Sequence, residues 1–472
     1  MVQTGTSTQP RTATRSTTLK PNTVGTAGIV FFVVAAAAPL AATLGASPLV
    51  FGANGIGAPG AYLAATVVLL LFAVGYAAMS RHVTGAGGFA TYISDGLGGP
   101  AGHAAAFVAL LAYNCMLAGI FGQLGAFAQS IFAGYGLDLP WQAWVAVGLA
   151  VVAVLGYRDV LISARVLGVL LVAEVLVLLV LDIAVIGSGG ADGVSAASFN
   201  PANVFGGASG IAIMFAFSCF IGFEATTIYG EEARDPKRTV PRATYIAILV
   251  IGLFYTMTMW AIGLGYGAND VAEQARANPV GFVLDLNTRY LGSTSTEVVN
   301  LLVLTSLLAV VLAFHHTLAR YLYSLGRAGA LPAALSRTRR GDQAPHVASI
   351  TQVAITAVII ATFSVFGADP FLHLFAWLVG VGTLGVLVLQ AAASVAVLAF
   401  FRRTRSDTRP WPTLIAPTLA LAGLLVAIYL VLRNFEVLTG ATSRVILYLP
   451  WLVPIAALVG LAMWTRSRRT RI

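Results

Sequence analysis

The sequence predicts an all-α membrane protein with twelve transmembrane helices. Hydrophobic residues make up 58% of the 472 residues and charged residues only 10%, whereas a soluble domain carries about 25% charged residues. Apolar runs long enough to cross a bilayer, about 20 residues each, alternate with short polar loops. These observations favour a multi-pass protein with little structure outside the membrane.

The apolar runs define the expected helices in chain order. They lie at residues 25–50, 60–80, 102–133, 140–157, 163–187, 206–230, 243–266, 295–325, 348–367, 371–400, 412–433 and 444–465. Residues 1–24 are rich in Thr and Ser. We expect them to form a cytoplasmic tail, because the next segment is too long for a signal peptide, and a transit peptide is the alternative. Residues 466–472 are expected to form a second cytoplasmic tail.

The net charge of +9 is spread in a way that indicates membrane topology and argues against a nucleic-acid partner. An even number of helices puts both termini on one side, and the loops of that side hold most of the basic residues. These are Arg81, Arg158, Arg165, Arg234, Lys237, Arg238, Arg242, Arg327, Arg337, Arg339, Arg340, Arg402, Arg403, Arg405 and Arg409. Basic loops stay in the cytoplasm, so we expect both termini there and the protein in the plasma membrane.

Two helices are interrupted at matching positions. Pro39, in the segment Ala35–Leu40, removes a backbone donor from the first helix. Gly222-Phe223-Glu224 interrupts the sixth. Each begins a block of five helices, residues 25–190 and 203–402, and residues 410–465 add two more. Paired broken helices indicate the binding site of a secondary transporter; the alternative is that both are ordinary kinks.

Several motifs resemble the amino acid–polyamine–organocation (APC) superfamily, and its amino acid permeases in particular, over about residues 25–465. They are the broken first helix, residues 84–92 (TGAGGFATY), 222–244, 320–332 (RYLYSLGRAGALP) and 344–347 (APHV). The resemblance implies a LeuT-type inverted repeat of five plus five helices, with the first and sixth unwound around the substrate. It also implies transport of amino acids or amines by proton symport or exchange. Here an Ala-rich segment replaces the Gly-small-Gly break of many members.

The unwound ends are the expected substrate site, because free amides at a helix N-terminus suit a carboxylate and free carbonyls suit an ammonium. The residues that we expect to bind substrate are Ala36, Ala37, Ala38, Pro39, Leu40, Tyr113, Phe217, Ser218, Phe220, Ile221, Gly222 and Phe223. The phenylalanines either close over the substrate or pack in the core. Tyr113 and its neighbour Asn114 in the third helix are candidates to face the cavity; the alternative is that they are ordinary helix-packing residues.

Two acids stand out within apolar runs. Glu224 is expected to act as a latch that bonds amides freed at the break, with direct ammonium binding as the alternative. Glu174 lies in the middle of the fifth helix, where an ionised side chain costs roughly 3 kcal/mol. We therefore expect Glu174 to bind and release the coupling proton; a hydrogen-bonded structural carboxyl is the alternative. The resemblance implies a lysine at this position in proton-coupled relatives, where this sequence has Glu174. The expected role in coupling therefore rests on the burial of the carboxyl more than on the family.

Other polar residues have plainer interpretations. Asp182 is expected to be a solvated residue near a helix end, and His315 and His316 to be buried and hydrogen-bonded. Arg320 is expected to pair at the inner gate with Asp95, Glu231, Glu232 or Asp235. Cys115 and Cys219 fall in apolar runs, so neither a disulfide nor a metal site is expected.

The preferred function is a secondary active transporter that imports amino acids, with a proton as coupling ion and no cofactor. A permease for amines, polyamines or ethanolamine and an amino acid exchanger remain alternatives, and Thr305 and Ser306 leave sodium coupling open. An intramembrane enzyme would need paired carboxylates or a Ser/His dyad, and an ATP-driven pump would need a phosphate loop. The sequence has neither. A channel remains a third possibility; it would normally show a short filter motif or rings of charge in an oligomer, and a single chain with two broken helices fits alternating access better.

Overall fold

A computed structural model gives the fold of this chain and describes residues 25–83, 88–158, 164–224, 226, 234–339, 344–439 and 447–469. These residues form helices and turns, with no β-strand among them. The apolar runs explain this choice, because a helix satisfies its backbone amides and carbonyls within its own segment, as a bilayer requires.

The helices of the first half follow the expected order. They are α1 (Thr26–Ala37), α2 (Pro39–Asn54), η1 (Gly55–Gly57), α3 (Ala58–Met79), α4 (Gly88–Leu97), α5 (Gly99–Ala133), α6 (Trp141–Tyr157), α7 (Ala164–Gly187), η2 (Ala197–Phe199), α8 (Pro201–Val204) and α9 (Ser209–Ser218). The first expected helix is thus split into α1 and α2.

The second half continues with helices that are mostly longer than predicted. They are α10 (Pro236–Tyr266), α11 (Val271–Ala277), α12 (Phe282–Leu291), α13 (Ser293–Arg327), η4 (Ala333–Ser336), α14 (His346–Val365), η5 (Pro370–Phe375), α15 (Ala376–Thr404), η6 (Trp411–Ile415), α16 (Ala416–Thr439), η7 (Leu449–Trp451) and α18 (Leu452–Arg469). The last helix runs into the expected C-terminal tail, and the expected tail 1–24 lies outside the described residues.

Length and composition support a multi-pass membrane protein. Within the described residues, eight helical stretches are long and apolar enough to cross a bilayer, and α1, α6, α9 and the last helix are shorter apolar helices. Each of the twelve expected ranges overlaps at least one of these helices. The sixth differs most, because α9 ends at Ser218 and part of the expected range 206–230 lies outside the described residues.

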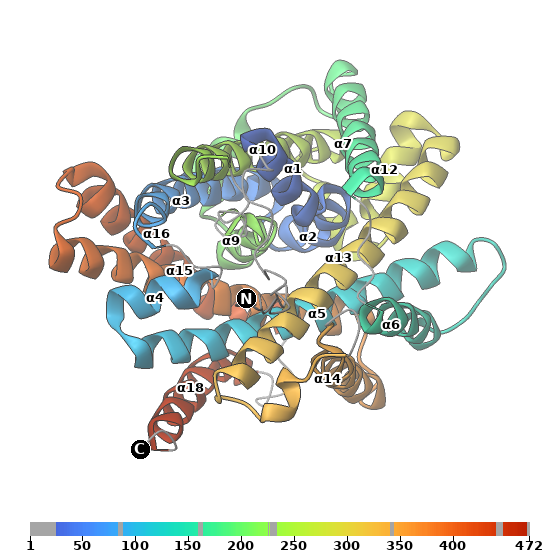
Figure 1. Ribbon diagram of the computed structural model, residues 1–472. Coiled ribbons are helices and arrows are strands. Elements are labelled where there is room, and N and C mark those ends of the chain that lie inside the picture. The colour runs from blue at the N-terminus through green and yellow to red at the C-terminus, as the bar shows by residue number, and fades with distance from the viewer. Residues whose placement is uncertain are drawn as a thin grey trace, which may run out of the picture.

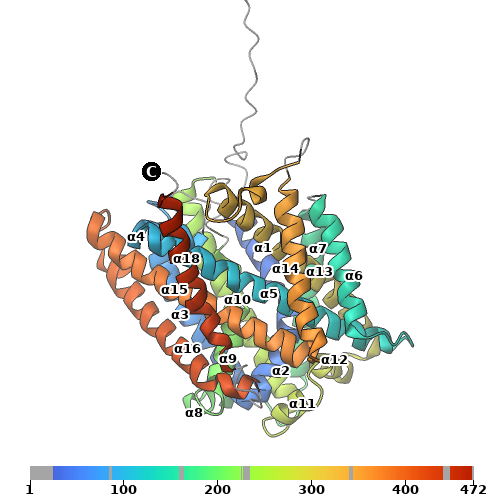
Figure 2. The ribbon, with the colours of Figure 1, turned by 90° about the horizontal axis from the view of Figure 1, so that it is seen from below.

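The broken helices lie side by side in the middle of the bundle. Figure 1 shows α2 against α9, with α5, α13 and α15 crossing beside them. Seen from the side, α4 and the C-terminus lie at one end of the bundle, and α8 and α11 lie at the other (Figure 2). We call these the α4 end and the α11 end. From the basic loops, we expect the α4 end to face the cytoplasm.

Among the described residues, four α-helices were not predicted because they lie in polar or glycine-rich connections, the short helix α8 being one of them. The helix α4 follows the glycine-rich motif, and α11 and α12 fill the loop between α10 and α13. Their sequences contain too few consecutive apolar residues to stand out as membrane spans. At the α11 end, α11 packs against α2, and α12 packs against α13 and α7.

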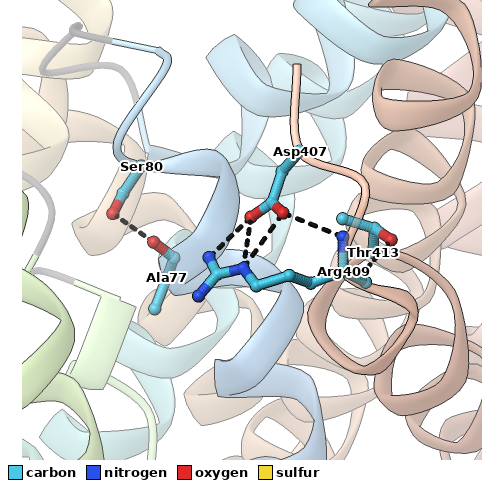
Figure 3. A network of polar contacts seen from close by, with 5 residues as sticks. All are labelled: Ala77, Ser80, Asp407, Arg409 and Thr413. Atoms are coloured by element: carbon cyan, nitrogen blue, oxygen red, sulfur yellow. Dashed lines mark hydrogen bonds and ion pairs between the residues drawn. The ribbon is translucent and has the colours of Figure 1, made fainter. Parts of the chain in front are cut away.

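The loop between α15 and α16 folds against the end of α3 (Figure 3). Asp407 accepts hydrogen bonds from the Arg409 guanidinium, the shortest 2.6 Å, which lowers the pKa of the Asp407 carboxyl to about 2. The ion pairs expected for Arg320 with Asp95 and Asp235 are absent from the described residues. Asp235 instead lies 3.8 Å from Arg238, and Arg403 donates to the backbone carbonyl of Asp95. The other candidates, Glu231 and Glu232, lie outside the described residues.

Candidate functional site

The first helix breaks at one residue, Ala38. Its φ of 44° and ψ of 70° are left-handed, and α1 ends before it while α2 begins after it. Pro39 causes the break, because its ring disfavours helical geometry at the preceding residue and it has no N–H of its own. The last carbonyls of α1 and the first amides of α2 therefore meet at the same depth.

Two backbone groups at this break lack their usual partner. The Leu40 amide donates to Glu174 Oε2 at 3.3 Å instead of continuing the helix to the Ala36 carbonyl. The Ala41 amide has no acceptor among the described residues, since the next bond of the new helix runs from the Ala42 amide to the Ala38 carbonyl. Among the described residues, the Ala36 carbonyl and the Ala41 amide therefore have no hydrogen-bond partner at this break.

The sixth helix stops opposite this break. After Ser218 the chain continues in single turns, such as the bond from the Ile221 amide to the Ser218 carbonyl. Gly222 has a φ of 115°, which only glycine adopts without strain. A Cβ built on it would lie 3.5 Å from the Cβ of Ala36, so the two interruptions touch.

Glu224 ties the second break to the third long helix. Its Oε2 accepts from the Gly222 amide at 2.9 Å, and its Oε1 accepts from the Tyr113 hydroxyl of α5 at 2.7 Å. The side chain is 6% exposed. Glu224 thus bonds a backbone amide of the unwound segment, as a latch would; its part in transport stays a prediction.

Glu174 holds the first break from the other side. It lies on α7, is 4% exposed, and accepts from the first-turn amide of α2, where the helix dipole favours a negative charge. Ser306 of α13 lies beside the same carboxyl, although its hydroxyl is outside hydrogen-bond geometry. Tyr255 of α10 donates to the Ala37 carbonyl at 3.0 Å. One carboxyl therefore joins α7 and α2 next to α13.

A cavity opens where the two breaks meet. Its volume is about 70 Å³, within about 530 Å³ of empty space that includes the open surroundings. Its lining consists of Ala36, Ala37, Ala38, Ala41, Ala42, Ala46, Met116, Ile120, Gln123, Ser218, Cys219, Ile221, Leu307, Val310, Phe314, Phe375 and Val379. Of the residues that the structure describes, none in this lining is Asp, Glu, Lys or Arg. The Gln123 side-chain amide donates to the Ala41 carbonyl at 2.7 Å. Such a site suits a small molecule whose charges are met by backbone groups.

A model of the amino acid permease family matches residues 28–472 of this chain. The chain belongs to the amino acid permease family. It is 28% identical over 349 residues to the branched-chain amino acid permease BcaP of Lactococcus lactis subsp. cremoris, which covers 68% of this chain and 70% of that protein. It is also 24% identical to the branched-chain amino acid permease BcaP of Bacillus subtilis, over 79% of each chain. A lysine-specific permease of the same Lactococcus is 27% identical over 35% of this chain and 32% of its own length.

Some of the predicted site residues of the permease line the cavity, and others do not. Those that line it are Ala36, Ala37, Ala38, Ser218 and Ile221, and those that do not are Pro39, Leu40, Tyr113, Phe217, Phe220, Gly222 and Phe223. Two of the phenylalanines pack in the core: Phe220 lies edge-on to Tyr255 and Phe223 lies edge-on to Phe72. Substrate contact by these residues stays a prediction.

Sequence reasoning missed the cavity walls contributed by α5, α13 and α15. Among them only Gln123 carried a signal, as an amide inside an otherwise apolar run. The remaining wall residues are aliphatic or aromatic and look like any other core residue. Asn114, expected in the cavity, instead accepts at 2.8 Å from Gln352 of α14.

The prediction for Asp182 was wrong. Its side chain is 1% exposed, and its Oδ2 accepts from the Thr258 hydroxyl at 2.8 Å. The chain after α7 folds back onto α10, where the Ala191 amide bonds the Leu264 carbonyl, and α12 packs against α7. The prediction for the histidines was correct: both are buried, and His315 Nε2 lies 2.9 Å from the Ser349 hydroxyl.

Proposed function

We propose that this permease imports amino acids with uncharged, apolar side chains, of the size of the branched-chain amino acids, by proton symport. In this proposal twelve helices cross the plasma membrane in a LeuT-type inverted repeat, and both termini lie in the cytoplasm. Alternating access moves the substrate past the two broken helices, with the cavity between them as its binding site.

The observation that carries the proposal is the match between the cavity and an amino acid. The unbonded Ala41 amide lies in the first turn of α2, where the partial positive charge favours a carboxylate. The unbonded Ala36 carbonyl lies at the end of α1, where the partial negative charge favours an ammonium. The rest of the wall is apolar and would surround an aliphatic side chain. The names of two relatives, branched-chain amino acid permeases, agree with this chemistry.

The same wall disfavours charged side chains and polyamines. A lysine side chain or a second amine would be buried without a carboxylate beside it, which is costly in a site that excludes water. Glu224 and Glu174 both lie behind the wall, where they bond backbone amides. This arrangement favours one zwitterion over a dibasic substrate.

Proton coupling is assigned to Glu174. Binding of a proton removes the negative charge that attracts the Leu40 amide, which loosens α7 from the first turn of α2. That turn also carries the Ala41 amide, so the proton and the substrate would act on the same element. An amino acid exchanger is the second candidate, favoured because a carboxyl that caps a helix also has a purely structural use.

The test is uptake in proteoliposomes with an inward proton gradient and no sodium. We expect accumulation of leucine, isoleucine or valine, and none of lysine, glutamate or ethanolamine. Rapid exchange with preloaded vesicles but no accumulation would establish the exchanger instead. Accumulation of lysine or ethanolamine would contradict the assignment of the cavity.

The variant Glu174→Gln separates coupling from structure, because its amide oxygen still accepts from the Leu40 amide but no longer takes up a proton. We expect proton-driven accumulation to be lost while exchange of preloaded substrate continues. The matched control is Glu273→Gln, the same change at an exposed residue of α11, which should behave like the wild type. Accumulation by Glu174→Gln at every pH would remove Glu174 from the coupling mechanism.

A further inference from the structure

A second buried acid lies on the helix that carries Glu174. Asp182 follows it by eight residues, which is about 12 Å along an α-helix. From Asp182 the helix continues only to Gly187, about 8 Å further, at the α11 end. In the orientation proposed above, Asp182 lies between the outer water and Glu174.

The surroundings of Asp182 do not suit a permanent negative charge. One carboxyl oxygen accepts from Thr258, and the other, Oδ1, is buried with no hydrogen-bond partner among the described residues. Loss of hydration disfavours an ionised carboxyl in this condition unless a cation pairs with it. Binding of a proton removes that cost and makes Oδ1 a donor.

No cation is bonded to Asp182 from the helices packed around α7, which are α1, α2, α10, α12 and α13. The helices α1 and α2 contain no titratable residue. On the nearby part of α10, Tyr255 and Tyr266 donate to backbone carbonyls. On α12 and the first half of α13 the titratable groups have other contacts: Asp285 with Asn278, Arg289 with the Tyr266 ring, Tyr290 with the Gly265 carbonyl, and Glu297 with Tyr135. The other titratable groups of α13 begin at His315, about 27 Å further along that helix than Glu297.

Two hydroxyls of α10 lie along the way from Asp182 to the first break. Thr258 bonds Asp182, and Tyr255, three residues earlier and hence on the same side of the helix, bonds the Ala37 carbonyl beside the turn held by Glu174. The two hydroxyls thus lie between Asp182 and the Ala37 carbonyl, which is next to the turn bonded by Glu174.

We propose that Asp182 is a second proton-binding site, which takes a proton from the α11 end and passes it to Glu174. The transfer converts the Asp182 acid and the Glu174 carboxylate into the Asp182 carboxylate and the Glu174 acid, and a proton from the outer water restores Asp182. The proposal rests on proton symport as the function of the permease.

The first test asks whether Asp182 binds a proton, without relying on transport. Infrared spectra of the full-length permease in liposomes, recorded as the pH is lowered, should contain a protonated-carboxyl band that disappears in Asp182→Asn. The band should persist in Asp192→Asn, a matched control at an exposed acid near the same end. It should move to another pH midpoint in Thr258→Val, which removes the hydroxyl. Identical bands in the wild type and Asp182→Asn would overturn the proposal.

The second test measures transport by the same variants. We expect Asp182→Asn to slow proton-driven accumulation at least roughly a hundredfold, the lower end of the range for loss of a positioned proton-transfer group, and to leave exchange intact. If the wild type accumulates substrate and Asp182→Asn does so equally well, the relay fails and proton symport stands. If the wild type shows exchange alone, proton symport fails and the relay fails with it.

Discussion

Two residues of the site have left-handed backbone conformations, and only one of them is a glycine. Ala38 has a φ of 44° although it is not glycine, whereas Gly222 has a φ of 115°. Left-handed geometry costs a residue with a Cβ about 1–2 kcal/mol. Strain of this kind persists where the surroundings demand it, which is common at ligand sites.

Replacement of Gly222 by alanine should impair transport through the backbone. The new Cβ would make only ordinary contact with Ala36, so the penalty comes from φ, at about 1–2 kcal/mol. We expect a several-fold lower uptake rate per molecule in the membrane. The matched control is Gly136→Ala, which has a φ of 79° in open space after α5. Its cost should be similar in thermal unfolding, with uptake unchanged; equal uptake by both variants would contradict a special role for the break.

At the scale of the helices, the sequence predicts the features that depend on nearby residues, such as helix length from apolar runs and helix breaks from proline and glycine. Both breaks were predicted from proline and glycine, because these residues act locally. The end of α9 at Ser218, four residues before Gly222, was not, since it depends on contacts with the first helix. The burial of Asp182 was missed for the same reason: α12, which covers α7, follows it by about a hundred residues.

Two glycines of α2, one heptad apart, predict different consequences of the same substitution. A Cβ on Gly45 would lie 2.7 Å from Gln123 Nε2 and 2.8 Å from the Phe375 ring, both in the cavity wall. Overpacking of this kind costs about 1–3 kcal/mol, so Gly45→Ala should raise the KM for uptake. Gly52→Ala meets only the flexible chain of Arg276 at 3.3 Å and should leave KM unchanged. An unchanged KM in Gly45→Ala would show that the wall adapts without affecting the substrate.

At the scale of the whole molecule, the two ends of the bundle differ in charge. Loops at the α4 end carry the arginines of residues 402–409, while the connection that holds α11 and α12 carries only Arg276 and Arg289. Membrane proteins retain their basic loops in the cytoplasm. The orientation of the proposed proton path depends on this asymmetry, because it sets which end of α7 meets the outer water.

Cysteine labelling in intact cells tests the orientation directly. Gln274→Cys places a thiol on the exposed face of α11, and Thr408→Cys places one in the exposed loop between α15 and α16. The native Cys115 and Cys219 are both buried, so the wild type should give little background. A membrane-impermeant maleimide should label Gln274→Cys in intact cells and Thr408→Cys only after permeabilisation. The opposite labelling pattern would show that the permease has the inverse orientation in the membrane. Asp182 would then lie on the cytoplasmic side of Glu174, where it could not receive the entering proton.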